Sequence, residues 1–253
     1  LLQRTTRRLN LTEEGRTLYE YCLTLIRTLE DAELALGSAR STPQGHLKVV
    51  APITFSQIYL ADIISGFLKK YPKIKLKLSL SDSVTDLVAE GFDLAIRIGQ
   101  LYDSSLKARK IGETRIIALA HKDYLSEKPP LETPDDLVNH NCLIYKYRGD
   151  RENYWLFQTK QEEFRVKVEG SFDSDNGLPL LQAAYNGLGI AYVPDFMVKR
   201  PLAHNMVEVL PNYCHLQHGI YIVYPSSRQE KINVRVFIDY LNDAFNEEPG
   251  NRL

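Results

Sequence analysis

The first helix that the hydrophobic pattern predicts covers residues 12–40. Its apolar residues are four and three positions apart, in a repeat of seven: Leu18, Cys22, Leu25, Leu29, Ala32, Leu36 and Ala39. Such a repeat keeps one narrow apolar stripe on the same side of a helix about 40 Å long. The stripe can pack on the helix's own domain or on a second copy of the chain, and the length of the helix favours the second copy. We therefore expect residues 12–40 to be a dimerisation helix, with these side chains at the contact: Leu18, Leu25, Leu29 and Leu36.

After a short polar segment at 41–45, strands alternate with helices. The pattern predicts a strand at 46–52, a helix at 56–71, a strand at 74–80, a short helix at 84–91 and a strand at 92–99. The segment IKLKLSL alternates strictly between the two faces of its strand, as half-buried strands do. Together these elements form a βαβαβ unit, in which right-handed crossovers make the sheet parallel.

A second α/β module begins near residue 121. The pattern predicts a helical piece at 136–140, strands at 142–147 and 164–172, a helix at 178–189 and a strand at 189–194. A last strand at 219–225 and an amphipathic helix at 230–246 return to the first module. With a crossing strand at 116–121, this arrangement gives two lobes joined by a hinge. We expect lobe I at 41–119 and 222–248, lobe II at 120–221, and a cleft between them.

Composition is that of a globular protein. Of the 253 residues, 44% are hydrophobic and 25% are charged, which is enough for a sizeable core in two domains. The formal net charge is −1, so any contact with nucleic acid must be local. No apolar run is long enough to span a membrane, and the amino terminus lacks a signal-peptide core. We expect a cytoplasmic protein without membrane contact.

No metal, cofactor or catalytic centre is expected. The densest group of metal-ligand residue types, Cys214, His215 and His218, supplies three ligands where structural zinc sites take four. The chain has no G-x-S-x-G, H-E-x-x-H, P-loop or G-x-G-x-x-G pattern. Cys142 and His140 are near each other only in sequence, which is weak support for a nucleophile and base.

Three turns have the residue types of a ligand site. In open α/β sheets, ligands bind beyond the carboxyl ends of the strands, where helix N-termini attract anions. The turns supply hydroxyl, amide and backbone N–H groups at Thr54, Phe55, Ser56, Ser81 and Asn176. Ordinary capping explains each turn by itself, but their convergence on one cleft predicts a site for a small carboxylate or other compact anion. Arg97 either pairs with this anion or lies exposed on its strand, and Tyr102 is a candidate for the pocket wall.

Several segments, in order, resemble the LysR-type transcriptional regulators. The segments are RTTRRLNLTEEG, GHLKVVAPITFSQIYL, DLVAEGFDLAIRIGQLYDSSL, DNGLPLLQAAYNGLGIAYVPDFM and GIYIVYPSSR. The resemblance covers nearly the whole chain. The segment EGFDLAIRIG, followed by DSSL, resembles the subgroup of the regulator CrgA.

The resemblance implies a winged helix-turn-helix, a dimerising linker helix and a two-lobed α/β effector domain like a type 2 periplasmic solute-binding protein. Residues 1–11 would be what remains of the wing, with these side chains against DNA phosphates or the minor groove: Arg4, Thr5, Thr6, Arg7 and Arg8. The helices that read double-stranded operator DNA would precede Leu1, so specific DNA binding is expected of the full-length protein. The resemblance also implies effector contacts at Thr54, Phe55, Ser56, Ser81, Arg97, Gly99 and Asn176.

The sequence therefore predicts a ligand-responsive transcriptional regulator that forms a homodimer or homotetramer. A free-standing solute-binding protein with the same two-lobed fold is the alternative. The heptad helix and the basic turn argue against this alternative, because a transport receptor has no use for a dimerising linker.

Overall fold

The computed structural model describes residues 1–4, 9–19, 21–22, 24–25, 28, 42–101, 105–146, 153–159, 161–198, 202, 205–228 and 231–247. The strands are β1 (Leu2–Arg4), β2 (Leu9–Leu11), β3 (Gly45–Ala51), β4 (Ile74–Leu80), β5 (Leu94–Ile98), β6 (Lys107–His121), β7 (Cys142–Tyr145), β8 (Tyr154–Gln158), β9 (Glu163–Lys167), β10 (Asp173–Ser174), β11 (Ile190–Pro194), β12 (Met206–Val209) and β13 (Gln217–Tyr224). The helices are α2 (Ile53–Phe55), the π-helix η1 (Ser56–Leu60), α3 (Ala61–Lys70), α4 (Lys122–Ser126), α5 (Gly177–Tyr185), α6 (Ile232–Glu247) and the 3₁₀-helices η2 (Pro134–Asn139), η3 (Asp195–Met197), η4 (Pro211–Tyr213) and η5 (Ser226–Arg228).

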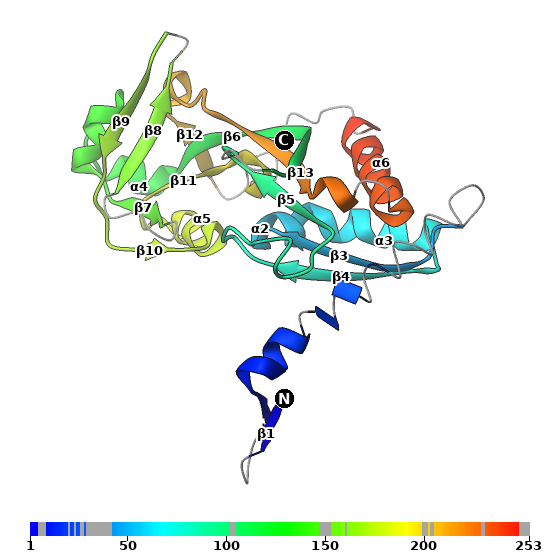
Figure 1. The fold of residues 1–253 in the computed structure, drawn as a ribbon. Helices are drawn as coiled ribbons and strands as arrows, with labels where there is room; N and C mark the ends of the chain where they lie inside the picture. Colours follow the sequence, from blue (N-terminus) through cyan, green and yellow to red (C-terminus); the bar gives the residue numbers. More distant parts are fainter. Residues whose placement is uncertain are drawn as a thin grey trace.

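One nine-stranded sheet runs through both lobes (Figure 1). Its order is β10-β7-β11-β6-β13-β5-β3-β4, and β12 pairs with β6 off this path. We call β3, β4, β5, β13, α2, α3 and α6 lobe I, and β7 to β12 with α5 lobe II. The first part of β6 pairs with β13, whereas residues 116–121 pair with β11 and β12. This shared strand is the predicted crossing between the lobes; the predicted lobe boundaries fall inside β6 and β13 and stay predictions.

Lobe I contains the predicted parallel unit. β3 lies between β4 and β5 and is parallel to both. Pro52, with φ −60° and ψ 142°, ends β3 and starts the helical segment α2–η1–α3, which begins three residues earlier than predicted. α3 and α6 pack together through Phe67 and Phe237, whose ring centroids are 4.8 Å apart and whose side chains are fully buried. This packing holds α3 against α6 on the sheet of lobe I.

The predicted helix at 84–91 is wrong. Residues 87–91 form turns, in which the Asp86 carboxylate accepts hydrogen bonds from the Val88 and Ala89 N–H groups at 3.0 Å. The φ of Gly91 is +71°, a left-handed conformation that ends a helix. The crossover between β4 and β5 therefore makes one helical turn and no more.

Lobe II contains a hairpin that the pattern did not predict. β8 and β9 pair with each other, antiparallel and outside the nine-stranded sheet. The strand predicted at 164–172 ends at Lys167, after which the chain reaches β10 beside β7. The hairpin packs Trp155 and Phe157 into a hydrophobic core on the side of the sheet away from α5. The side chains of α5 belong to a different core, on the other side of the sheet. This hairpin places aromatic side chains next to the hinge.

The lobes also meet through side chains. The fully buried ring of Phe55 in α2 lies edge-on to Phe196 in η3, with centroids 5.5 Å apart. The Asp195 carboxylate accepts hydrogen bonds from Thr114 Oγ1 at 2.8 Å and from the Arg115 N–H at 3.1 Å. A single hydrophobic core therefore extends from lobe I into lobe II beside β6.

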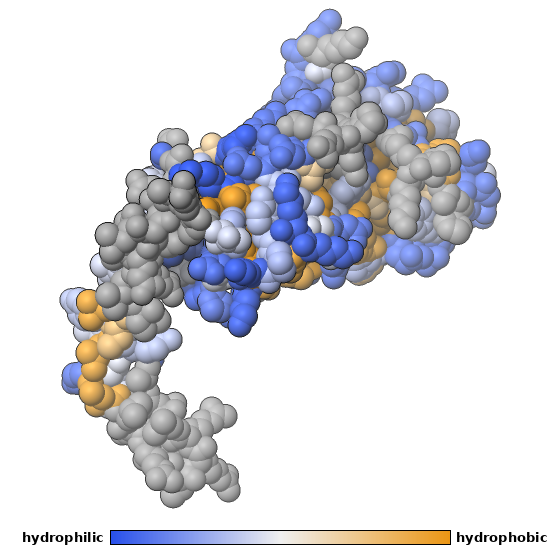
Figure 2. Space-filling model, turned by 90° about the vertical axis from the view of Figure 1, so that its right-hand side faces the viewer, coloured by the Kyte–Doolittle hydropathy of each residue, from blue (hydrophilic) through white to orange (hydrophobic). Residues whose placement is uncertain are grey.

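The amino-terminal segment lies apart from the sheet in Figure 1. β1 and β2 form an antiparallel hairpin, and helical residues follow from position 13. Thr12 Oγ1 accepts a hydrogen bond from the Gly15 N–H at 3.1 Å, so Thr12 is the N-cap of this helix. Leu18 and Leu25 are 46% and 64% exposed, and Figure 2 shows hydrophobic side chains on the surface of this segment. The predicted contacts at Thr5, Thr6, Arg7, Arg8, Leu29 and Leu36 lie outside the described residues.

None of the helices in the described part of the chain combines the length and the apolar character needed to cross a membrane.

Candidate functional site in the cleft

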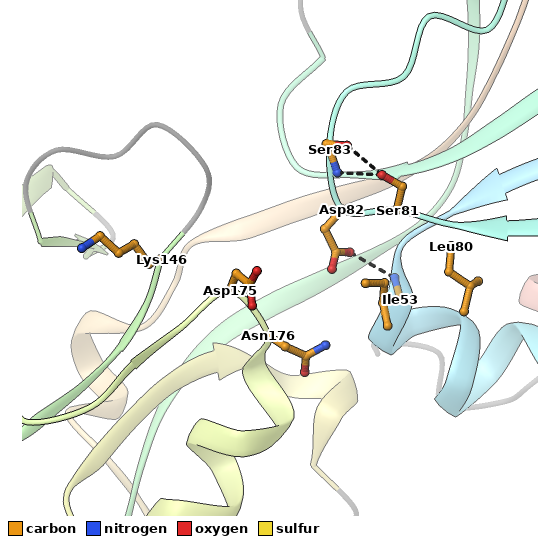
Figure 3. Close-up of a pocket in the computed structure, with 8 residues that line it drawn as sticks. All are labelled: Ile53, Leu80, Ser81, Asp82, Ser83, Lys146, Asp175 and Asn176. Atoms are coloured by element: carbon orange, nitrogen blue, oxygen red, sulfur yellow. Dashed lines mark hydrogen bonds between the residues drawn. The ribbon is translucent and has the colours of Figure 1, made fainter. Parts of the chain in front are cut away.

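Two adjoining cavities lie between the lobes. The ring cavity has a volume of about 360 Å³ and is lined by Pro52, Thr54, Phe55, Ser81, Asp82, Arg97, Ile98, Gly99, Ile116, Tyr145, Tyr154, Trp155, Leu156, Tyr192, Pro194, Phe196, Met197, Leu216 and His218. The polar cavity, shown in Figure 3, has a volume of about 310 Å³ and is lined by Ile53, Leu80, Ser81, Asp82, Ser83, Lys146, Asp175 and Asn176. Ser81 and Asp82 line both cavities. A ligand in this cleft therefore has an apolar and a polar side available.

The site forms where three parallel strands of lobe I end. β3 ends before Pro52, β4 ends before Ser81, and β5 ends before Gly99. The φ of Gly99 is +106°, and a Cβ at this position would lie 3.9 Å from His218 Nδ1. A side chain at residue 99 would therefore strain the backbone at the cavity edge. The turns after these strands are where the sheet topology predicts a ligand.

A carboxylate of the chain itself binds the N-terminus of the helical segment α2–η1–α3 in lobe I. Asp82 Oδ1 accepts a hydrogen bond from the Ile53 N–H at 3.0 Å, drawn as a dashed line in Figure 3. Burial raises the pKa of Asp82 above its usual value, the Ile53 hydrogen bond opposes this shift, and the negative charge of Asp175 adds to it. The position at which the sequence predicted an anionic ligand therefore holds a partly desolvated acid.

Thr54 and Asn176 join the two lobes across the cleft. Thr54 is 4% exposed, and its hydroxyl donates a hydrogen bond to Asn176 Oδ1 at 3.4 Å. The same Asn176 oxygen accepts a hydrogen bond from the Leu178 N–H at 2.9 Å, so Asn176 is the N-cap of α5. The N-termini of α2 and α5 thus face each other, and a change in lobe spacing alters the Thr54–Asn176 contact directly.

Arg97 is held at the edge of the ring cavity by the crossover turn. Its guanidinium donates hydrogen bonds to the carbonyl oxygens of Ser83 at 2.7 Å and Thr85 at 3.4 Å. These contacts tie β5 to the turn after β4. The arginine is therefore both a wall of the cavity and a support for its polar side.

The structure brings most of the sequence-predicted residues together. Thr54, Phe55, Ser81, Arg97 and Gly99 line the ring cavity, and Asn176 lines the polar cavity. Ser56 lines neither, because its hydroxyl donates to the Pro52 carbonyl at 2.7 Å within the helix. Tyr102 lies outside the described residues.

The aromatic wall of lobe II was missed by the sequence analysis. Trp155 of β8 stacks on Tyr192 of β11 with centroids 5.0 Å apart, and both line the ring cavity with Phe196. The alternation in YWLFQ was the available signal for β8. His218 also lines the cavity, and burial lowers its pKa, which favours a neutral imidazole. The neighbouring Cys214 is buried, and burial raises the pKa of its thiol to about 11.

Comparison with known proteins gives a consistent set of similarities. The family described as LysR substrate binding domain matches residues 40–246. An uncharacterized HTH-type transcriptional regulator of Haemophilus influenzae is 36% identical over 235 residues, which cover 92% of this chain and 81% of the relative. The HTH-type transcriptional regulator PtxR of Pseudomonas aeruginosa is 32% identical over 250 residues, which cover 98% of this chain and 80% of the relative.

Solved structures show the same similarity. The LysR-type regulator CrgA of Neisseria meningitidis superposes with a TM-score of 0.71 at 29% identity, covering 97% of this chain and 83% of CrgA. The full-length virulence activator AphB of Vibrio cholerae superposes with a TM-score of 0.72 at 30% identity, covering 95% of this chain and 82% of AphB.

Proposed function

Because this chain belongs to the LysR family of transcriptional regulators, we propose that a small effector bound in the ring and polar cavities controls how the full-length protein binds DNA. The relatives are HTH-type transcriptional regulators, which favours a ligand-responsive regulator over a free-standing solute-binding protein. No step in this function requires catalysis by the chain.

The observation that supports this proposal is a cavity with walls from both lobes. Thr54 and Arg97 come from lobe I, whereas Trp155 and Tyr192 come from lobe II. A ligand that contacts both walls binds different lobe arrangements with different affinities, so its binding shifts the population toward one of them. β6 runs through both lobes and transmits such a shift to the rest of the domain.

DNA binding and self-association belong to the amino-terminal part in this proposal. Residues 1–11, with Arg4 in β1, would contact the DNA backbone as the wing of the helix-turn-helix. Residues 12–40 would pair two copies of the chain through the stripe that includes Leu18 and Leu25. The effector lobes at 41–119 with 222–248 and at 120–221 would then change the spacing of the DNA-binding heads.

Replacing Thr54 by valine is expected to weaken effector binding about tenfold, because the variant keeps the side-chain shape and loses the hydroxyl at the lobe contact. The probes are small metabolites that raise the melting temperature of the unmodified protein. Their dissociation constants can be followed by the fluorescence of Trp155, the one tryptophan of the chain and a wall of the ring cavity.

Ser56→Ala is the matched control, since this nearby hydroxyl bonds within its own helix and lines neither cavity. The control should bind the same compounds within about twofold of the unmodified protein. Equal affinities of Thr54→Val and the unmodified protein would remove Thr54 from the effector site.

A further inference from the structure

The ring cavity has the shape and lining of a site for an aromatic compound. Aromatic residues of both lobes line it: Phe55 from lobe I, and Tyr145, Tyr154, Trp155, Tyr192 and Phe196 from lobe II. Trp155 and Tyr192 are stacked, and Phe55 and Phe196 are edge-to-face, so the rings support one another in fixed positions. A volume of about 360 Å³ is at the small end of ligand sites. One aromatic ring with a short side chain fits this space.

The polar side of the cavity favours a hydrogen-bond donor over a carboxylate. The Asp82 carboxylate already accepts the Ile53 N–H that an anionic ligand would use, at 3.0 Å. Arg97, the cation of the ring cavity, donates to the carbonyl oxygens of Ser83 and Thr85. The Ile53 N–H and two N–H groups of Arg97 therefore already donate to acceptors of the protein itself.

A second carboxylate approaches from the opposite lobe. Figure 3 shows Asp82 and Asp175 on the two sides of the polar cavity, with Lys146 directed away from them. Lys146 Nζ forms an ion pair with Asp173 at 3.2 Å. An anionic ligand would therefore come close to two like charges, whereas an ammonium group would be attracted by both.

We propose that the effector is a compact aromatic compound with its ring against the wall formed by Trp155, Tyr192 and Phe196 and an ammonium group directed to Asp82. This inference rests on the proposed function, because it names the ligand class of the same cavity. It reverses the charge that the turn residues alone predicted, since those residues did not reveal which group occupies the helix N-terminus. A bound ammonium would attract the carboxylates of Asp82 and Asp175, which come from opposite lobes, and would favour an arrangement with the lobes closer together.

Tyramine and 4-hydroxyphenylacetate test this charge preference. The two compounds have the same phenol ring on a short chain and differ in an ammonium or a carboxylate at its end. Titration of the full chain, followed by the fluorescence of Trp155 and by the melting temperature, is expected to show at least tenfold tighter binding of tyramine, about the ratio that one charge-assisted hydrogen bond supplies.

Asp82→Asn should reduce this preference to about twofold or less, because the amide oxygen keeps the acceptor for the Ile53 N–H and the charge is lost. Asp62→Asn, an exposed position in α3, is the control and should keep the full preference. Retention of the preference in Asp82→Asn overturns the assignment of Asp82.

Equal or tighter binding of 4-hydroxyphenylacetate, or binding of neither probe, overturns the proposed ligand class. If only 4-hydroxyphenylacetate changed the fluorescence of Trp155, the cavity would still be the effector site and the proposed function would still hold. The proposed function fails on a separate result, namely a full-length protein whose DNA binding is unchanged by every compound that binds the cavity.

Discussion

Replacing Phe55 by alanine is expected to lower the free energy of unfolding by about 3–5 kcal/mol. The Phe55 side chain is fully buried, and its ring lies 5.5 Å from that of Phe196 and 6.0 Å from that of Phe245, centroid to centroid. These contacts join α2, η3 and α6 at one point. Truncation would remove the aromatic contacts of all three elements and leave a cavity in the core next to the ring cavity.

Urea unfolding, followed by circular dichroism, measures this loss for Phe55→Ala. Val138→Ala is the control, because Val138 is 80% exposed and its truncation should change the stability by less than about 0.5 kcal/mol. A loss below about 1 kcal/mol for Phe55→Ala would mean that the lobes do not share one cooperative core at this position.

Replacing both Leu18 and Leu25 by lysine is expected to weaken self-association more than about a hundredfold, so that micromolar protein becomes monomeric. Both leucines are on the predicted seam, and both are exposed on the described helix, at 46% and 64%. A seam that pairs two copies would bury these side chains, and charged groups there would have no partners.

Analytical ultracentrifugation distinguishes the two states. Thr17→Lys adds one lysine to the same helix away from the seam, at an exposed position, and should leave the dimer intact. A double leucine variant that sediments as a dimer would show that surfaces of the effector lobes, and not this helix, hold the copies together.

The hydrophobic pattern of the sequence predicted the strands and helices that depend on residues close together in the chain. The alternation in IKLKLSL and the run before Pro52 give β4 and β3, which pair in parallel as expected. The helix predicted at 84–91 fails because Asp86 caps a turn that Gly91 then ends. Of the apolar residues in that segment only Leu87 is deeply buried, whereas Val84 and Val88 are 80% and 61% exposed, so their spacing does not reflect the buried face of a helix.

The polar turns of the candidate site were predictable, and its aromatic wall was not. Thr54, Ser81 and Asn176 stand at strand ends and helix starts, and the topology of an α/β sheet brings such positions together. Trp155 and Tyr192 come from strands in which an aromatic residue is ordinary core, so nothing in their spacing marks them as cavity walls. The occupancy of the Ile53 N–H by Asp82, a contact across 29 positions, depends on the tertiary fold.

The most direct test of effector control is the binding of the full-length protein to its operator DNA in the absence and presence of a cavity ligand. The ligand is one identified by its effect on Trp155 fluorescence. We predict that saturating ligand changes the operator dissociation constant or the length of protected DNA, and that Thr54→Val requires about tenfold more ligand for the same change. If the operator dissociation constant and the length of protected DNA were the same with and without saturating ligand, the proposal that this cleft is the regulatory site would be contradicted.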